Sequence, residues 1–292
     1  MLRARAKINL GLTVIGRRPD GFHDVESVMQ QISLSDTLLF EPQPGKGFVF
    51  ESTDPDLAGP ENLICRSAAL LEEKTGQPLP GVKVTLHKNI PVSAGLAGGS
   101  SDAAAALLGL NKFLQTKLGR PELLELACRL GSDVPFCLQG GTFLARGRGE
   151  KLKRLPALPF SWVVLALPRG VQISTAAAYG SFDRRLLGKP DLKPLVAAIK
   201  RGRRNDITAW LSGGFTNTLE TAKLPGSEQV ANLKSLLRDC GLKPVYSGSG
   251  PALFMVLENY NDARSAAGAV ENRGGKSFLC WTTGTNKEWL NV

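Results

Sequence analysis

The chain has 292 residues, enough for one large domain or two ordinary ones, and 42% of them are hydrophobic against 21% charged. This composition excludes an intrinsically disordered chain, and its two histidines, His23 and His87, are too few for a histidine-rich metal site. The formal net charge of +10 suggests an anionic partner, although solubility alone would explain it equally well.

The sequence carries no signal for a membrane, for secretion or for nucleic acid. The longest strongly apolar run, residues 160–167, is too short to cross a bilayer, and the N-terminal stretch lacks a signal-peptide cleavage pattern. The five cysteines form no CxxC pair, which is typical of reduced, buried thiols. The basic runs at 151–154 and 200–204 are not interleaved with aromatic residues, as base stacking would require. We therefore expect a cytoplasmic protein that binds neither a membrane nor nucleic acid.

In the N-terminal half, hydrophobic periodicity predicts a mixture of strands and helices. Alternating apolar residues predict extended chain over residues 4–15, 25–40 and 82–87, with a Pro-Asp-Gly turn after the first stretch. Helical spacing predicts helices over residues 62–74 and 121–130, and Gly131 marks the end of the second.

In the C-terminal half, the pattern predicts a strand at 161–167 and a glycine-rich turn that leads into a second strand within 246–257. Three helices are expected, over residues 191–201, 228–240 and 261–272. The Pro- and Lys-rich segment 149–159 separates the two halves, so we expect domains over residues 1–155 and 156–292.

A glycine-rich loop over residues 91–101 follows the strand at 82–87, and a helix is expected to begin after it. Backbone N–H groups at the start of a helix can bind phosphate oxygens, and glycines let an anion approach them closely. No lysine follows the last glycine, so this is not a P-loop, nor does it match G-x-G-x-x-G. Two interpretations stay open: a phosphate cradle, or simply a helix that starts close to a strand. Asp102 is expected to cap this helix.

Five ordered motifs together favour the phosphate cradle. The chain contains AKINLGL at 6–12, RRPDGFH at 17–23, PVSAGLAGGSSDAA at 91–104, GSDVPF at 131–136 and SGSGPALF at 247–254. This set resembles the GHMP kinase superfamily, and most closely the branch whose acceptor is 4-diphosphocytidyl-2-C-methyl-D-erythritol. The resemblance implies an α+β fold, with an N-terminal domain like domain 2 of ribosomal protein S5, a ferredoxin-like C-terminal domain and a site between them.

The resemblance also implies a reaction, the transfer of the ATP γ-phosphoryl group to the acceptor's 2-hydroxyl in the non-mevalonate route to isoprenoid precursors. Asp133 would accept the hydroxyl proton, and Lys7 would lie beside it and favour the developing alkoxide. In isolation, Asp133 is an acid in the first turn of a helix and Lys7 a surface residue on an edge strand.

The acceptor contacts are likewise implied by the resemblance. His23 would hydrogen-bond the cytosine, which would stack between Tyr179 and Phe22, at a position where many relatives carry tyrosine. Asn9 would contact the methylerythritol portion, with Thr175 near the base, and Gly248 and Gly250 would line the cleft.

For ATP, the resemblance implies contacts along the whole loop, at Pro91, Val92, Ser93, Ala94, Gly95, Leu96, Ala97, Gly98, Gly99, Ser100 and Ser101. The adenine would lie near Asn62 and Lys88, although Asn62 could equally cap a helix and Lys88 be a loop charge. Mg²⁺ would be held by ATP and Ser101, because no second carboxylate is evident. Thr218 stands where the resemblance leads us to expect an acid.

Two alternatives remain at this point. One is another small-molecule kinase of the superfamily, acting on homoserine, mevalonate or a sugar. The other is a basic RNA-binding module, which predicts steeply salt-dependent RNA binding and no kinase turnover. The favoured partner is a small molecule, and we expect a monomer or a weak homodimer.

Overall fold

The computed structural model describes residues 1–181 and 190–286. Its larger part is a six-stranded sheet in which β3, β4, β2, β5 and β6 are neighbours in that order and β1 pairs with β2. The strands are β1 Leu2–Arg17, β2 His23–Lys46, β3 Phe48–Ser52, β4 Pro80–His87, β5 Thr142–Gly147 and β6 Lys151–Arg154. Every even-numbered residue of β1 from Ala4 to Val14 is buried, because alternate side chains of a strand point to the same face.

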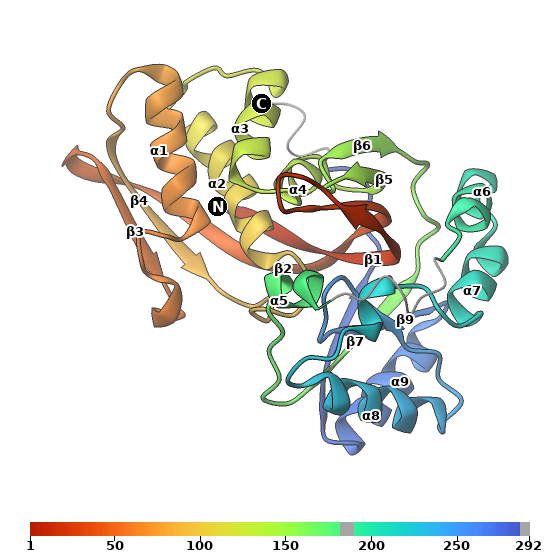
Figure 1. Cartoon of the computed structure of the whole chain (residues 1–292). Helices are drawn as coiled ribbons and strands as arrows, with labels where there is room; N and C mark the ends of the chain where they lie inside the picture. The colour runs from red at the N-terminus through yellow and green to blue at the C-terminus, as the bar shows by residue number, and fades with distance from the viewer. Residues whose placement is uncertain (182–189, 287–292) are drawn as a thin grey trace.

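Helices cover one face of this sheet (Figure 1). They are α1 Leu63–Thr75, α2 Gly98–Phe113, α3 Arg120–Leu130 and α4 Val134–Gln139. Helix α2 is buried from Ser101 to Asn111, because it packs against the sheet, α1, α3 and α4. Gly109 permits its close contact with the sheet: a Cβ atom there would lie 2.0 Å from the ring of Phe40.

The smaller part is a four-stranded antiparallel sheet in the order β10-β7-β9-β8. Its strands are β7 Trp162–Pro168, β8 Val245–Tyr246, β9 Leu253–Leu257 and β10 Gly275–Trp281. The helices of this half are α5 Thr175–Gly180, α6 Lys193–Arg201, α7 Arg204–Ser212, α8 Ser227–Arg238 and α9 Tyr260–Asn272. Val164 and Ala166 pack with α8 and α9, whereas Val163 and Leu165 face the opposite way, toward β1.

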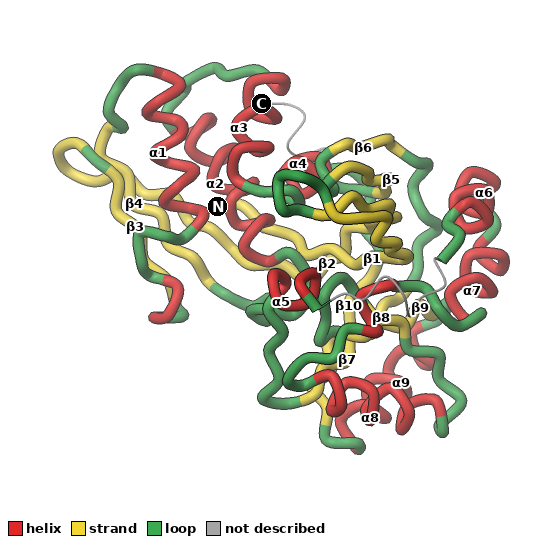
Figure 2. The backbone as a smooth tube through the Cα atoms, in the orientation of Figure 1, coloured by secondary structure: helices red, strands yellow, loops and turns green. Residues whose placement is uncertain are grey.

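The two sheets share a hydrophobic core. Ile8 and Leu10 of β1 pack in one cluster with Leu165 of β7 and Phe254 of β9. After β10 the chain returns to the larger part, where Thr282 pairs with Ile32 and Thr285 with Gly140. Figure 2 shows the loops that meet between the two sheets, around α5. The larger sheet ends at Arg154 and the smaller one begins at Trp162, and a domain boundary at residue 155 stays a prediction.

The mixed α and β architecture expected from the sequence is confirmed, but one helix boundary was misplaced. Helix α2 begins at Gly98, so the last residues of the glycine-rich stretch form its first turn rather than a loop ahead of it. The structure describes no helix in this chain that is long and apolar enough to cross a lipid bilayer.

Candidate active site

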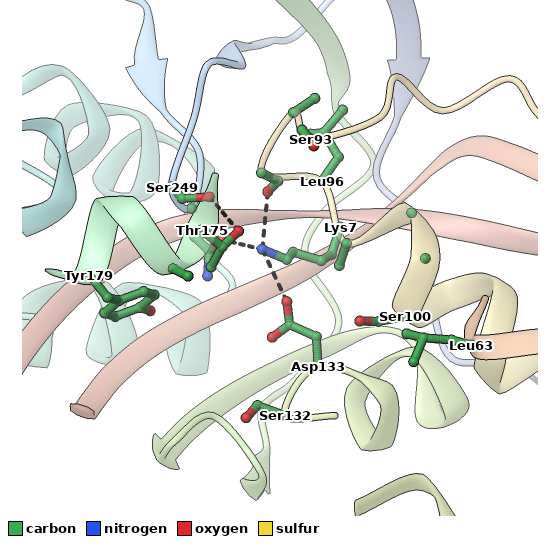
Figure 3. Close-up of a pocket in the computed structure, with 18 of the residues that line it drawn as sticks. Lys7, Leu63, Ser93, Leu96, Ser100, Ser132, Asp133, Thr175, Tyr179 and Ser249 are labelled. Carbon is green, nitrogen blue, oxygen red and sulfur yellow. Dashed lines mark hydrogen bonds and ion pairs between the residues drawn. The ribbon is translucent and has the colours of Figure 1, made fainter. Parts of the chain in front are cut away.

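A cavity of about 1110 Å³ opens where the two halves meet. Its lining combines β1, the turn after β1, the 91–100 segment, the start of α4, helix α5 and the 248–249 turn. These segments lie far apart in the sequence, so the fold is what brings them together. Figure 3 shows the centre of this cavity.

Lys7 and Asp133 meet at that centre. The Lys7 Nζ lies 3.6 Å from Asp133 Oδ2, donates to Asn9 Oδ1 over 2.7 Å and donates to the carbonyl of Gly95 over 3.1 Å. Lys7 is only 4% exposed, so it is not the surface residue that its position in a strand would suggest. A buried ammonium needs such partners to offset its lost hydration.

Asn9 is fixed on the other side of Lys7. Its amide nitrogen donates to Ser27 Oγ over 2.8 Å, and Ser27 Oγ donates to the carbonyl of Gly11 over the same distance. This chain orients the Asn9 carbonyl oxygen toward the ammonium. Lys7 is therefore held in one position before any ligand binds.

The 91–100 segment lines the cavity along its whole length. Gly95 has φ +74°, and a Cβ atom there would lie 2.5 Å from the Ser247 carbonyl oxygen, so only glycine fits. Ala97 is left-handed, with φ 56°, and directs the chain into α2. The N–H groups of the first turn of α2 are thereby presented at the cavity, and the positive end of its dipole adds to their attraction for an anion.

Ser101 does not reach the cavity, which corrects its expected role as a magnesium ligand. Ser101 is buried and its hydroxyl donates to the Gly98 carbonyl over 2.8 Å, whereas Ser100 lines the cavity on the side of Asp133. Among the described residues there is no group of three His, Cys, Asp or Glu side chains that could hold a metal ion. A magnesium ion therefore fits this site only if it arrives bound to a nucleotide, whose phosphate oxygens would supply most of its ligands.

The expected adenine contacts, Asn62 and Lys88, both line the cavity but have structural partners as well. Asn62 caps α1 by accepting from the Ile64 N–H over 2.9 Å, so the capping alternative is correct. Lys88 is not an isolated loop charge, because its ammonium pairs with Asp36 and, over 3.2 Å, with Asp102. Asp102 therefore accepts a hydrogen bond from Lys88 rather than capping the helix, and burial raises its pKa well above the ordinary range.

The expected base-binding residues lie together at the other end of the cavity. The rings of His23 and Tyr179 are 5.4 Å apart, with 32° between their planes, and Phe22 lies at the same end with its side chain 51% exposed. Burial lowers the pKa of His23, and Arg17 lowers it further, which favours the neutral ring at pH 7. Burial and the Asp133 charge raise the pKa of Tyr179, so its hydroxyl remains a donor.

The 247–250 turn closes the cavity from the smaller half. Thr175 and Ser249 share a hydrogen bond of 3.0 Å between their hydroxyls, and Gly248 lines the cavity. Gly250, expected in the lining, is not there: it lies behind the turn, where a Cβ atom would be 2.0 Å from the Tyr246 hydroxyl.

Asn217 supports this turn, and its neighbour Thr218 contacts β1. The Asn217 amide donates to the Gly248 carbonyl over 2.8 Å. Thr218 Oγ1 accepts from the Val14 N–H and donates to the Leu12 carbonyl. The threonine that replaces an expected acid thus ties this segment to β1.

Two arginines in the lining, Arg17 and Arg148, were not anticipated from the sequence. Arg17 belongs to the RRPDGFH motif but was passed over, and no motif marked Arg148. A search for basic residues beside glycines would have found the Gly147-Arg148-Gly149 turn.

Known proteins resemble this chain in sequence and in fold. Residues 62–141 match the family model of the GHMP kinases N terminal domain. The chain is 46% identical to the 4-diphosphocytidyl-2-C-methyl-D-erythritol kinase of Pelotomaculum thermopropionicum, covering 90% of this chain and 91% of that one. It is 43% identical to the enzyme of that name from Moorella thermoacetica, covering 92% and 94%.

A crystal structure of 4-(cytidine 5'-diphospho)-2C-methyl-D-erythritol kinase superposes with a TM-score of 0.79 at 36% identity, covering 97% of this chain and 99% of that one. The fold and the glycine-rich helix start are those of a GHMP kinase, a class of small-molecule kinases that use ATP. Within that class, the chain belongs to the 4-diphosphocytidyl-2-C-methyl-D-erythritol kinase family.

The role of the first turn of α2 can be tested at Gly99. A Cβ atom there has Leu63 Cδ1 at 4.0 Å as its nearest neighbour, so Gly99→Ala should fold normally. The added methyl would occupy the space through which a phosphate approaches the N–H groups, and we expect KM for ATP to rise on the order of 10-fold, the effect of weakening one charged hydrogen bond. Steady-state kinetics measures this. Gly268→Ala, in open space on α9, should change nothing, and an unaltered KM in Gly99→Ala would place the phosphates elsewhere.

Proposed function

We propose that this protein transfers the γ-phosphoryl group of ATP to the 2-hydroxyl of 4-diphosphocytidyl-2-C-methyl-D-erythritol, a step in the non-mevalonate synthesis of isoprenoid precursors. The observation that carries the proposal is the buried Lys7–Asp133 pair, which lies between the glycine-rich start of α2 and the His23–Tyr179 end of one cavity. A phosphate donor and a cytidine-bearing acceptor can therefore reach the same pair of groups from opposite sides.

In the proposed reaction, Asp133 accepts the proton of the 2-hydroxyl while the hydroxyl oxygen attacks the γ-phosphorus. The bond from the γ-phosphorus to the bridging oxygen breaks, and ADP leaves with that oxygen. The Lys7 ammonium lies within 3.6 Å of the carboxylate and stabilises the negative charge on the attacking oxygen. Ser100 is the hydroxyl placed to help hold a Mg²⁺ ion bound to ATP, and such an ion would supply neutralisation of the phosphate charge.

At the acceptor end, neutral His23 offers one nitrogen donor and one acceptor to the cytosine edge. Phe22 and Tyr179 supply the aromatic faces against which the pyrimidine stacks. Asn9 and Thr175 line the space between the base and Asp133, where the methylerythritol portion would lie. We place this reaction in the cytosol and expect the protein to act as a monomer or weak homodimer.

The direct test supplies ATP, Mg²⁺ and one acceptor at a time, and uses mass spectrometry to detect the gain of one phosphate. We expect phosphorylation of 4-diphosphocytidyl-2-C-methyl-D-erythritol and none of homoserine, mevalonate or galactose, because the latter three lack a base for the His23 end of the cavity. Phosphorylation of one of those three in its place would contradict the proposal. A preparation of Asp133→Asn serves as the control for contaminating kinases.

A further inference from the structure

Two cationic side chains in the cavity have no function in the reaction as described so far. Among the residues that the structure describes, four lysine or arginine side chains line the cavity: Lys7, Arg17, Lys88 and Arg148. Lys7 is paired with Asp133, and Lys88 with Asp36 and Asp102. Within residues 1–181 and 190–286, neither Arg17 nor Arg148 forms an ion pair with a carboxylate.

Strand register brings these two arginines to the same end of the cavity. Strand β2 lies between β1 and β5, and Arg17 of β1 is opposite His23, the first residue of β2. Two residues further along β2, Val25 is opposite Gly147 of β5, which directly precedes Arg148. Arg17 and Arg148 therefore flank the beginning of β2 from its two sides.

Arg148 lies over Phe22 at the base end of the cavity, and the residue after it lies near Asp133. Its guanidinium carbon is 4.7 Å from the centroid of the Phe22 ring, which places the cation over the aromatic face. The next residue, Gly149, is close to Asp133: a Cβ atom there would lie 3.8 Å from Oδ1. The turn that carries Arg148 therefore borders both Phe22 and Asp133, the two ends between which the acceptor would extend.

The surrounding acids form their ion pairs with other arginines. Asp20, in the turn beside Phe22, and Asp24, on β2, both pair with Arg18, and Glu26 pairs with Arg146; the Arg148 charge acts on Asp20 only from a distance and helps to lower its pKa. The Glu150 carboxylate accepts the backbone N–H of Arg148 over 2.7 Å, which fixes the turn rather than the guanidinium. Gly147 and Gly149 have φ of +69° and +118°, so this tight turn keeps its shape only with glycine at both positions.

We infer that Arg17 and Arg148 form a subsite that binds the diphosphate of the acceptor. The inference rests on the proposed function, which sets a pyrimidine at one end of the acceptor and the reacting hydroxyl at the other, with two phosphates between them. Guanidinium groups suit this task because their planar forks bind phosphate oxygens through paired hydrogen bonds. Arg148 is held over Phe22 before the ligand arrives, so little rotational freedom is lost on binding.

Calorimetric titration with cytidine, CMP and CDP tests the subsite, with a non-hydrolysable ATP analogue present throughout so that CDP cannot occupy the ATP site. For the unaltered protein, affinity should rise from cytidine to CMP to CDP. In Arg17→Gln and Arg148→Gln the affinity for CDP should fall about 10-fold or more, as expected for a lost charged hydrogen bond, while the affinity for cytidine stays the same. Arg148→Lys, which keeps the positive charge, should lose less affinity for CDP than Arg148→Gln.

Arg146→Gln is the matched control, because Arg146 lies two residues away, is exposed, pairs with Glu26 and is not in the lining. It removes the same charge and should leave all three affinities unchanged. In steady-state kinetics, Arg17→Gln and Arg148→Gln should raise KM for the acceptor and leave KM for ATP unchanged, whereas Arg146→Gln should change neither.

A CDP affinity unaffected by both substitutions would overturn the subsite. Equal losses of affinity for cytidine and CDP would overturn it too, because the arginines would then only support the base pocket. A fall in kcat with an unchanged acceptor KM would also overturn the subsite, because the guanidinium charges would then act on the transferred phosphate rather than on the diphosphate of the acceptor. If the unaltered protein binds none of the three ligands, the proposed acceptor itself is wrong.

Discussion

Asp133→Asn is expected to lower kcat by ~10²- to 10⁴-fold, the usual contribution of a general base, with little change in either KM. The amide cannot accept the hydroxyl proton, yet it has the same shape as the carboxylate. Asp133 precedes α4 as its N-terminal cap residue but makes no capping hydrogen bond with its side chain, so the substitution removes no helix-stabilising contact. The measurement is steady-state kinetics at saturating ATP and acceptor, with circular dichroism to check the fold.

The control for this change is Asp239→Asn, which removes one negative charge from an exposed position at the end of α8. Its kcat should equal that of the unaltered protein. If Asp133→Asn retained kcat within a few-fold, the proton would have another acceptor and the proposed role of Asp133 would be abandoned.

Lys7→Met is expected to lower kcat by ~10²- to 10³-fold, comparable to the loss of one oxyanion-stabilising donor. Methionine fills the space of the lysine stem, but the charge beside the attacking oxygen is lost. The change also leaves the side-chain oxygen of Asn9 and the carbonyl of Gly95 without this donor, and we expect the free energy of unfolding to fall by about 1–3 kcal/mol. Kinetics and thermal unfolding measure the two effects separately.

Lys83→Met is the matched control, since Lys83 lies on β4, far from the cavity lining, and pairs with Glu51 at the surface. It removes the same charge and should leave kcat unchanged. The double variant Lys7→Met, Asp133→Asn gives a sharper test. If the two groups act as a couple, the double variant should be about as slow as the slower single variant, whereas multiplied losses would indicate independent roles.

The sequence alone predicted the residues of the proposed catalytic pair, but not their environment. AKINL and GSDVPF drew attention to Lys7 and Asp133, whereas the burial of Lys7 depends on Asn9, on the Gly95 carbonyl and on the packing of β1 against the smaller half. Those contacts join segments far apart in the chain, and periodicity within one strand carries no information about them.

The two neighbouring serines show how a small error in an element boundary changes a site. Successive residues of a helix point about 100° apart. With α2 assumed to begin after residue 101, either serine could face a ligand, whereas the start at Gly98 turns Ser100 to the cavity and Ser101 to the helix backbone. The role of Asp102 could not be predicted either, because its contacts lie outside its own helix. Its partner Lys88 follows β4, and Asp36, which also contacts Lys88, comes from β2.

Arg17 and Arg148 were missed for a different reason. They are 131 positions apart, and only the register of β1, β2 and β5 places them at the same end of the cavity. The edge strands β3, β6 and β10 were missed as well. β3 and β6 are short and carry little periodic signal, and β10 does not alternate between polar and apolar residues.

The return of the chain after β10 has a consequence for biosynthesis. The Asn286 amide donates to the carbonyl of Cys137 in α4, and the Thr283 N–H donates to the carbonyl of Gln31 in β2. A nascent chain emerging from the ribosome presents Lys7 and Asp133 well before residues 283–286, which make these ties to α4 and β2. The mature arrangement around α4 is therefore completed only after residue 286 has emerged, and a shorter nascent chain lacks these two ties.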